Sequence, residues 1–221
     1  MSPKSSVSMR DVAVLAQVSV GTVSNVLNFP ERVSEPMRLR VQDAIAKLGW
    51  VPNESARQLR AGRSRSIGMV VMDIANPYFT DVIKGAEGYL YQEQYSVHVG
   101  NSQSDPAREL TLLDRLEQQR VGGVLLAPID EGVERAIRLR QRGIPVVMVD
   151  RAGFTTDFCS VGVDDIAGGR LAGQHLIDLG HQRLAFVGGP SSLAQVRDRR
   201  RGIELAVEAA AGAVSLLSVS T

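Results

Sequence analysis

The run VSVGTVSNVLN, residues 18–28, gathers hydrogen-bonding side chains in one short segment near the N-terminus. Its hydroxyl and amide groups belong to Ser19, Thr22, Ser24, Asn25 and Asn28. A core helix would favour Leu and Ala, and a strand would not carry Gly21 in its middle. Hydroxyls and amides at the start of a helix suit phosphate oxygens and base edges, and the helix dipole favours the phosphates. This segment therefore offers noncovalent recognition of a partner outside the fold.

Two short helices are expected to position these side chains. Ser8 and Asp11 supply the two halves of a capping box for the first helix. Its apolar face is predicted to contain Val12, Leu15 and Ala16. After a turn at Gln17, Ser19 caps a second helix that runs from Val20 to about residue 27. The predicted buried face of the second helix contains Val23, Val26 and Leu27.

A third helix is predicted between a Ser34 cap and Gly49. Its apolar stripe recurs at helical spacing through Met37, Val41, Ala44, Ile45 and Leu48. Two short helices joined by a tight turn form a helix-turn-helix when the second can enter a major groove. The alternative is a plain helical hairpin that only packs.

The stretch VPNESARQLRAGRSRS, residues 51–66, combines an apolar pair, Ala56 and Leu59, with four arginines. A helix between Pro52 and Gly62 would be too short to be stable alone, since roughly 12–15 residues are needed in water. The segment is therefore either a basic linker or a hinge helix that folds on DNA. In the second case, Leu59 would wedge into a minor-groove base step.

Charge is distributed unevenly along the 221 residues. Through Arg65 there are ten basic and five acidic residues, whereas the rest has fifteen basic and nineteen acidic residues. A basic head on a mildly acidic body is typical of nucleic-acid binding. No apolar run approaches the roughly 20 residues of a membrane span, and no secretory signal is evident, so a cytoplasmic protein is expected. The single Cys159 is expected to be a buried small hydrophobe.

From Ser66 onward, strand-like and helix-like segments alternate. The predicted strands are 66–72, 96–100, 122–127, 144–149, 159–163 and 183–188. The predicted helices between them are about 78–94, 106–119, 132–142 and 164–179. Most of these strands are continuously apolar, as strands buried on both faces are, so we expect a doubly wound parallel sheet.

Ligands of such sheets bind at the carboxyl ends of the strands. The polar residues expected there include Asp73, Asn76, Tyr78, Asn101 and Asp150, followed by the Gly188–Gly189–Pro190 turn. Asp73 and Asp150 could be read as paired catalytic carboxylates. Hydrogen bonding to a polyol is the more economical interpretation.

Two other functional classes, an enzyme and a periplasmic binding protein, fit the sequence less well than a DNA-binding protein. An enzyme is disfavoured because His98, His175 and His181 are scattered, and because no nucleophile elbow, P-loop or zinc-spaced Cys/His set is present. A periplasmic binding protein would fit the body, but it would carry a signal peptide and no basic head. The sequence predicts no catalytic residue, no metal and no cofactor.

With these motifs in view, the chain resembles the LacI/GalR family of bacterial transcriptional repressors. The resemblance is carried by Asp11–Val12–Ala13, Val18–Ser19, Thr22–Val23–Ser24, Val26–Leu27–Asn28 and Val51–Pro52–Asn53. In the body it is carried by Asn76–Pro77–Tyr78–Phe79 and by Gly180–His181 before the strand that ends at Gly188. It extends over about residues 8–211.

The resemblance implies a small all-α helix-turn-helix head and an α/β effector domain like a periplasmic sugar-binding protein, with parallel sheets. The domains expected are the head at 8–50, a hinge helix and linker at 51–65, and an effector-binding and dimerisation domain at 66–221. The DNA-binding residues expected are Ser8, Ser19, Val20, Gly21, Thr22, Ser24, Asn25, Asn28, Asn53, Ala56 and Leu59. The effector-binding residues expected are Asp73, Tyr78, Phe79, Asp150 and Arg199.

The sequence departs from the family pattern at two positions of the head and in its length, and each departure has an expected consequence. Gln17 replaces the usual turn glycine, which would cost on the order of 1 kcal/mol at positive φ. Asn25 replaces an arginine that reads guanine, and Asn pairs best with adenine. The second effector subdomain is only begun, so the chain is expected to be a fragment or a truncated product.

The function expected is a sequence-specific, DNA-binding transcriptional regulator, a repressor controlled by a small molecule such as a sugar. Its expected partners are double-stranded operator DNA, the effector and a second copy in a homodimer. Two heads would occupy successive major grooves, and the regulator would be cytoplasmic and associated with the nucleoid.

Overall fold

A computed structural model of the chain describes residues 7–51, 64–129, 133–151 and 158–220. The chain divides into two compact units, Met1–Gly62 and Arg63–Thr221. The predicted hinge residues Asn53, Ala56 and Leu59 lie outside the described residues. Among the described residues, no helix is long and apolar enough to cross a membrane.

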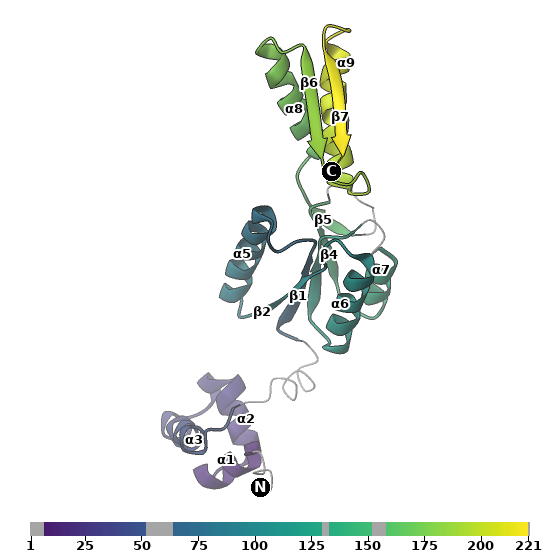
Figure 1. Ribbon diagram of the computed structural model, residues 1–221. Coiled ribbons are helices and arrows are strands. Elements are labelled where there is room, and N and C mark those ends of the chain that lie inside the picture. The colour runs from purple at the N-terminus through teal and green to yellow at the C-terminus, as the bar shows by residue number, and fades with distance from the viewer. Residues whose placement is uncertain (1–6, 52–63, 130–132, 152–157, 221) are drawn as a thin grey trace. The chain divides into compact units, whose positions relative to one another are not determined.

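In its described part, residues 7–51, the first unit contains three α-helices and one 3₁₀ turn (Figure 1). They are α1 (Met9–Ala16), α2 (Val20–Asn28), η1 (Pro30–Arg32) and α3 (Glu35–Leu48). The capping box of α1 is present in both halves, since Ser8 accepts from the Asp11 N–H and Asp11 accepts from the Ser8 N–H. Ser34 occupies the N-cap of α3 as predicted, but its side chain makes no capping hydrogen bond.

Valine and alanine side chains from the three helices, together with Trp50 after α3, form the core of this unit. The buried members are Val12, Ala13, Ala16, Val23, Val26, Val41, Ala44 and Trp50. The predicted stripe of α1 was wrong at one position, because Leu15 is 48% exposed and Ala13 is buried instead. Gln17 ends α1 with φ 53°, in the left-handed region where glycine is favoured.

The second unit begins with a five-stranded parallel sheet in the order β2-β1-β3-β4-β5. Its strands are β1 (Ser66–Val71), β2 (Ser96–Asn101), β3 (Gly123–Leu126), β4 (Val146–Val149) and β5 (Cys159–Val161). Helix α5 (Pro77–Gln92) covers one face, and α6 (Pro106–Gln118) and α7 (Val133–Gln141) cover the other (Figure 1). Cys159 is exposed on the short edge strand β5, so the expectation that it is buried was wrong.

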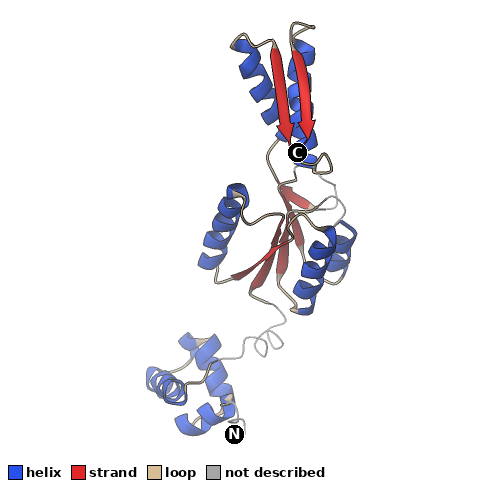
Figure 2. Ribbon diagram, viewed as in Figure 1, coloured by secondary structure: helices blue, strands red, loops and turns tan. Residues whose placement is uncertain are grey.

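A second parallel sheet pairs β6 (Arg183–Gly188) with β7 (Ser215–Ser220). Helices α8 (Asp165–Asp178) and α9 (Ala194–Ala209) lie behind one face of this pair (Figure 2). The two helices approach backbone to backbone. A Cβ added at Gly169 would lie 2.0 Å from the Arg199 carbonyl oxygen, and one at Gly202 would lie 2.1 Å from the Ile166 carbonyl oxygen. Glycine is therefore required at both positions.

Candidate nucleic-acid interface and ligand site

Helix α2 buries its valines and leaves its hydroxyl-and-amide side accessible. Val23 and Val26 are in the core of the first unit, whereas Val20, Gly21 and Asn25 are exposed. Thr22 and Ser24 are half-buried. These side chains can therefore reach a partner outside the fold, as the sequence predicts.

Several of these polar groups are held in place by bonds within the helix. The Ser19 hydroxyl accepts from the Thr22 N–H at 3.1 Å and lies 2.9 Å from the Thr22 hydroxyl. The side-chain amide of Asn28 donates to the Ser24 carbonyl at 2.9 Å and to the Ser24 hydroxyl at 3.3 Å. The side chains at both ends of α2 are thus oriented before any partner binds.

A second group of polar side chains gathers in the larger unit, and we call it the polar cluster. Its members are Tyr78, Asp150, Asp165, Gln195 and Arg199. Tyr78 lies in the first turn of α5, which is capped by the Asn76 carboxamide at 3.0 Å. Asp150 directly follows β4, and Asp165 begins α8. Gln195 and Arg199 lie one helical turn apart on α9.

Asp150 is at the centre of the polar cluster and is only 6% exposed. Its backbone has φ 62°, a conformation that is uncommon outside glycine and often marks functional sites. Burial raises the pKa of its carboxyl group, and contacts with Tyr78 and Gln195 oppose that shift. Its Oδ2 accepts from the Gln195 amide, but its buried Oδ1 has no hydrogen-bond partner among the described residues.

The four remaining members give Asp150 two neutral neighbours, Tyr78 and Gln195, and two charged ones, Asp165 and Arg199. Burial raises the pKa of Tyr78 to about 12, and the nearby Asp150 carboxylate adds to the shift. The Asp165 carboxylate is paired with Arg199, whose Nε lies 2.7 Å from Oδ1. The polar cluster can therefore accept hydrogen bonds at carboxylates and donate them from a guanidinium.

Three of the five predicted effector residues, Tyr78, Asp150 and Arg199, are brought together in the polar cluster. Asp73 is exposed, and its carboxylate accepts from the Ala75 N–H at 2.9 Å in a turn. Phe79 is 3% exposed in the apolar core, where its ring meets Tyr78 edge-on at 5.2 Å. Phe79 therefore lies behind Tyr78, and its side chain belongs to the core.

Asp165 and Gln195 were not among the predicted site residues. Asp165 sits at the start of a predicted helix, where an acidic residue is favoured by the helix dipole and is easily assigned to that role alone. Gln195 precedes the predicted Arg199 by four residues, which is one helical turn. Once this segment is known to be helical, that spacing puts Gln195 and Arg199 on the same face of α9.

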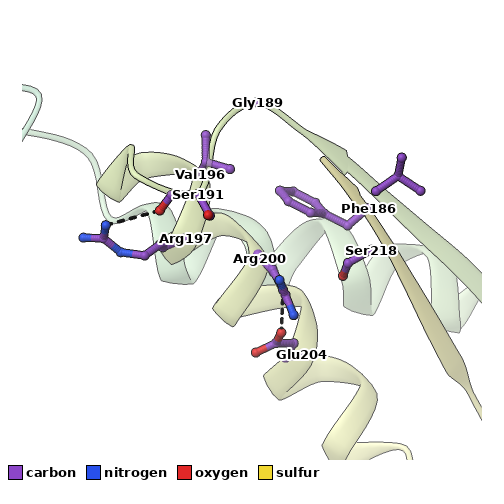
Figure 3. Close-up of a pocket in the computed structure, with 9 residues that line it drawn as sticks. Phe186, Gly189, Ser191, Val196, Arg197, Arg200, Glu204 and Ser218 are labelled. Atoms are coloured by element: carbon purple, nitrogen blue, oxygen red, sulfur yellow. Dashed lines mark hydrogen bonds and ion pairs between the residues drawn. The ribbon is translucent and has the colours of Figure 1, made fainter. Parts of the chain in front are cut away.

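A separate pocket of about 330 Å³ opens between the β6-β7 pair and α9 (Figure 3). It contains none of the predicted effector residues, although Arg197, Arg200 and Glu204 line it. Arg197 donates to the carbonyls of Ser191 and Ser192, and Arg200 pairs with Glu204 at 2.8 Å. Each of these charged side chains thus has a partner within the chain.

Comparisons with known proteins bear on both sites. Residues 8–53 match the family described as "Bacterial regulatory proteins, lacI family". Residues 64–219 match "Periplasmic binding proteins and sugar binding domain of LacI family". The ribose operon repressor of Escherichia coli K12 is 36% identical over 203 residues, which cover 91% of this chain and 62% of the repressor. The transcriptional repressor PurR of Aliivibrio fischeri MJ11 is 33% identical over 200 residues, which cover 90% of this chain and 59% of PurR.

Solved structures agree with these relatives. The lac repressor dimer bound to operator and the anti-inducer ONPF superposes with a TM-score of 0.82 at 28% identity, covering 98% of this chain and 65% of that one. A complex of the regulator CelR with cellobiose gives 0.58 at 28% identity and covers 97% and 66%. The chain thus spans about three fifths of the length of the curated relatives it matches. With both segments matched, the resemblance is confirmed, and the chain belongs to the LacI family of bacterial transcriptional regulators.

Proposed function

We propose that the protein is a sequence-specific, DNA-binding transcriptional repressor controlled by a small molecule, a sugar or related metabolite. The observation that carries this proposal is the exposed hydroxyl-and-amide side of α2 above a buried valine face. Such a helix can place its N-terminal side chains against base edges while the helix dipole attracts phosphates. The curated relatives support it, because they are named as repressors.

We propose the polar cluster as the site of the effector. Arg199 and Asp165 come from the second subdomain, whereas Asp150 and Tyr78 come from the five-stranded sheet and its helix. A ligand that contacts both sets would change their relative arrangement, which couples ligand binding to the DNA-binding state. The hinge role of residues 51–65, with Leu59 as a minor-groove wedge, stays a prediction.

We further propose a homodimer whose two heads occupy successive major grooves of a near-palindromic operator, in the cytoplasm on the nucleoid. The lac repressor neighbour is a dimer on its operator, which supports this arrangement. In this chain, α5 and the adjacent edge strand β2 expose Tyr89, Tyr91 and Val99. A second copy is the occupant we propose for this apolar surface.

The test begins with selection of bound duplexes from a random library, followed by fluorescence anisotropy of the selected duplex. Affinity is expected to fall steeply between 50 and 200 mM salt, because phosphate contacts release counterions. Val20→Asp should reduce affinity by about tenfold or more, since its carboxylate would face phosphates. Gln42→Asp on the exposed side of α3 adds the same charge as a control. If no duplex is enriched, or if Val20→Asp binds as well as the parent, the repressor assignment is wrong.

A further inference from the structure

The pocket between the β6-β7 pair and α9, which we call the α9 pocket, is lined by none of the members of the polar cluster. Its volume of about 330 Å³ is at the small end of the range for ligand pockets, which runs from about 300 to 1,000 Å³. Three α9 side chains that line it, Val196, Arg200 and Glu204, recur every four residues and so form one line along the helix. Arg199 instead pairs with Asp165 on α8. The α9 pocket is therefore separate from the proposed effector site.

Phe186 and Val196 give the α9 pocket an apolar wall. The Phe186 ring points from the sheet toward the helix, on which Val196 lies (Figure 3). Both side chains flank Gly188, because a Cβ there would lie 2.7 Å from Phe186 Cε1 and 3.1 Å from Val196 Cγ1. Such a wall can pack against a ring or a branched hydrocarbon chain.

Arg200 gives the same pocket a hydrogen-bond donor. Its Nε donates to Glu204 Oε1 at 2.8 Å, which holds the guanidinium against α9 (Figure 3). Its two terminal nitrogens make no hydrogen bond with the described residues. A guanidinium presents such nitrogens as a planar fork that matches the two oxygens of a carboxylate. The pocket therefore combines an apolar wall with one donor fork.

The charges that line the α9 pocket restrict its ligand further. The lining has two guanidinium groups, from Arg197 and Arg200, and one carboxylate, from Glu204. This leaves an excess of one positive charge, which a singly charged anion would neutralise. A doubly charged phosphate would exceed that balance and would be repelled by Glu204, and a cation would be repelled by the arginines. The lining thus favours a ligand with one negative charge.

We propose that the α9 pocket binds a small organic carboxylate that carries an apolar ring or branched chain, and that Arg200 is its anchor. The carboxylate oxygens accept from the two terminal nitrogens of Arg200, and the apolar part packs against Phe186 and Val196. This site goes beyond the proposed small-molecule control, since it differs from the polar cluster in its residues and in the charge of its ligand.

Amide chemical-shift titration of the nitrogen-15-labelled chain tests this proposal with phenylacetate. Its uncharged counterpart phenylacetamide, acetate without the ring, and inorganic phosphate are the comparison probes. Phenylacetate is expected to shift the amides of Phe186, Val196 and Arg200, with a dissociation constant of about 1 mM. Each comparison probe is expected to bind at least about fivefold more weakly, because it lacks the single charge or the ring.

Four outcomes of this titration would overturn the proposal. They are binding of phenylacetamide as tight as that of phenylacetate, tighter binding of phosphate, shifts confined to residues of the polar cluster, and no saturable shift with phenylacetate. These comparisons use the parent protein and need no variant to fold.

Arg200→Gln then tests the anchor and is expected to weaken phenylacetate binding at least about fivefold. Arg201→Gln is the matched control, because it removes the same charge from the next position of α9. Arg201 also pairs with Glu204, at 3.6 Å, but it does not line the α9 pocket. Equal weakening by the two variants would reflect only the loss of positive charge on α9, and it would overturn the role of Arg200.

Discussion

The Gln195 side-chain amide donates to Asp150 twice, to Oδ2 at 2.8 Å and to the backbone carbonyl at 3.3 Å. Both residues are buried, and they come from α9 and from the end of β4. This pair ties the second subdomain to the first at the centre of the polar cluster. A ligand bound at Asp150, as proposed above, would therefore act on the position of α9 through this contact.

Gln195→Ala is expected to destabilise the larger unit by about 1–3 kcal/mol, because Oδ2 of Asp150 would stay buried without its donor. Urea unfolding followed by far-UV circular dichroism measures the change. Gln174→Ala is the control, since Gln174 is exposed and its side-chain amide donates to Asp178 on the same helix. Equal midpoints for the two variants would show that the Asp150 contact contributes nothing.

Glu109 gives the larger unit a pH dependence. Its side chain is 1% exposed and accepts from the Ile129 N–H at 2.9 Å. Burial raises its pKa to about 7, although the Ile129 bond opposes the shift. The unfolded chain releases this proton near the ordinary value of 4.5, so stability should fall as the pH rises from about 4.5 to 7.

Glu109→Gln keeps the acceptor and removes the ionisation. The free energy of unfolding of the variant should rise relative to that of the parent protein as the pH rises through that interval. The difference should reach at most about 3 kcal/mol at pH 8. Thermal unfolding at a series of pH values measures this difference. Glu87→Gln on the exposed side of α5 should show no such gain. A constant offset between Glu109→Gln and the parent at every pH would refute the assignment.

Gln17→Gly is expected to stabilise the first unit by about 0.5–1 kcal/mol, because residue 17 has φ 53° and glycine adopts that conformation without strain. The single tryptophan, Trp50, lies in the core of this unit, so its fluorescence follows the unfolding. Gln42→Gly inside α3 should instead cost about 1 kcal/mol. Destabilisation by both substitutions would contradict the account of Gln17.

Asn25 is expected to read adenine through its side-chain amide, which presents a donor and an acceptor together. Asn25→Ala should relax the preference at one operator position by about 1–3 kcal/mol, and Asn25→Arg should shift it towards guanine. Repeating the duplex selection with each variant measures both outcomes. If the consensus sequence of the selected duplexes does not change in either variant, Asn25 does not contact a base.

Tyr91 is 72% exposed on α5, and its replacement tests the dimer surface. Tyr91→Asp should shift the chain towards monomer, because it buries a charge in an apolar interface. Sedimentation velocity measures the distribution. Leu110→Asp, on the helix that covers the opposite face of the sheet, is the control (Figure 1). If both variants sediment as the parent does, the two copies meet elsewhere.

The sequence predicts the order of most elements because their signals are local. Ser8 and Ser19 cap their helices, and the strand at 183–188 has the predicted bounds. Helix α9 was not predicted, because its N-cap, Leu193, makes no side-chain bond and its first turns are crowded with arginine. A helix that is stabilised mainly by packing against its neighbours, without a capping side chain, is not evident from its sequence alone.

Three errors have tertiary causes. Local spacing permits Leu15 or Ala13 on the buried side of α1, and contact with α3 decides between them. Cys159 is exposed because β5 lies at the edge of its sheet, a position set by strand order. Asp165 and Gln195 join the polar cluster through partners 34 and 45 residues away, Arg199 and Asp150. Such pairings depend on the fold and are not contained in any single motif.

The close crossing of α8 and α9 gives the proposed effector site a determinant that lies outside the site itself. Gly169 and Gly202 carry no group that a ligand could touch, yet they fix how far Asp165 lies from Arg199. One methyl group at either position would wedge the helices apart and loosen that ion pair. A substitution at either glycine would therefore change the geometry of the proposed site without touching anything bound there, because glycine contributes to this crossing by having no side chain.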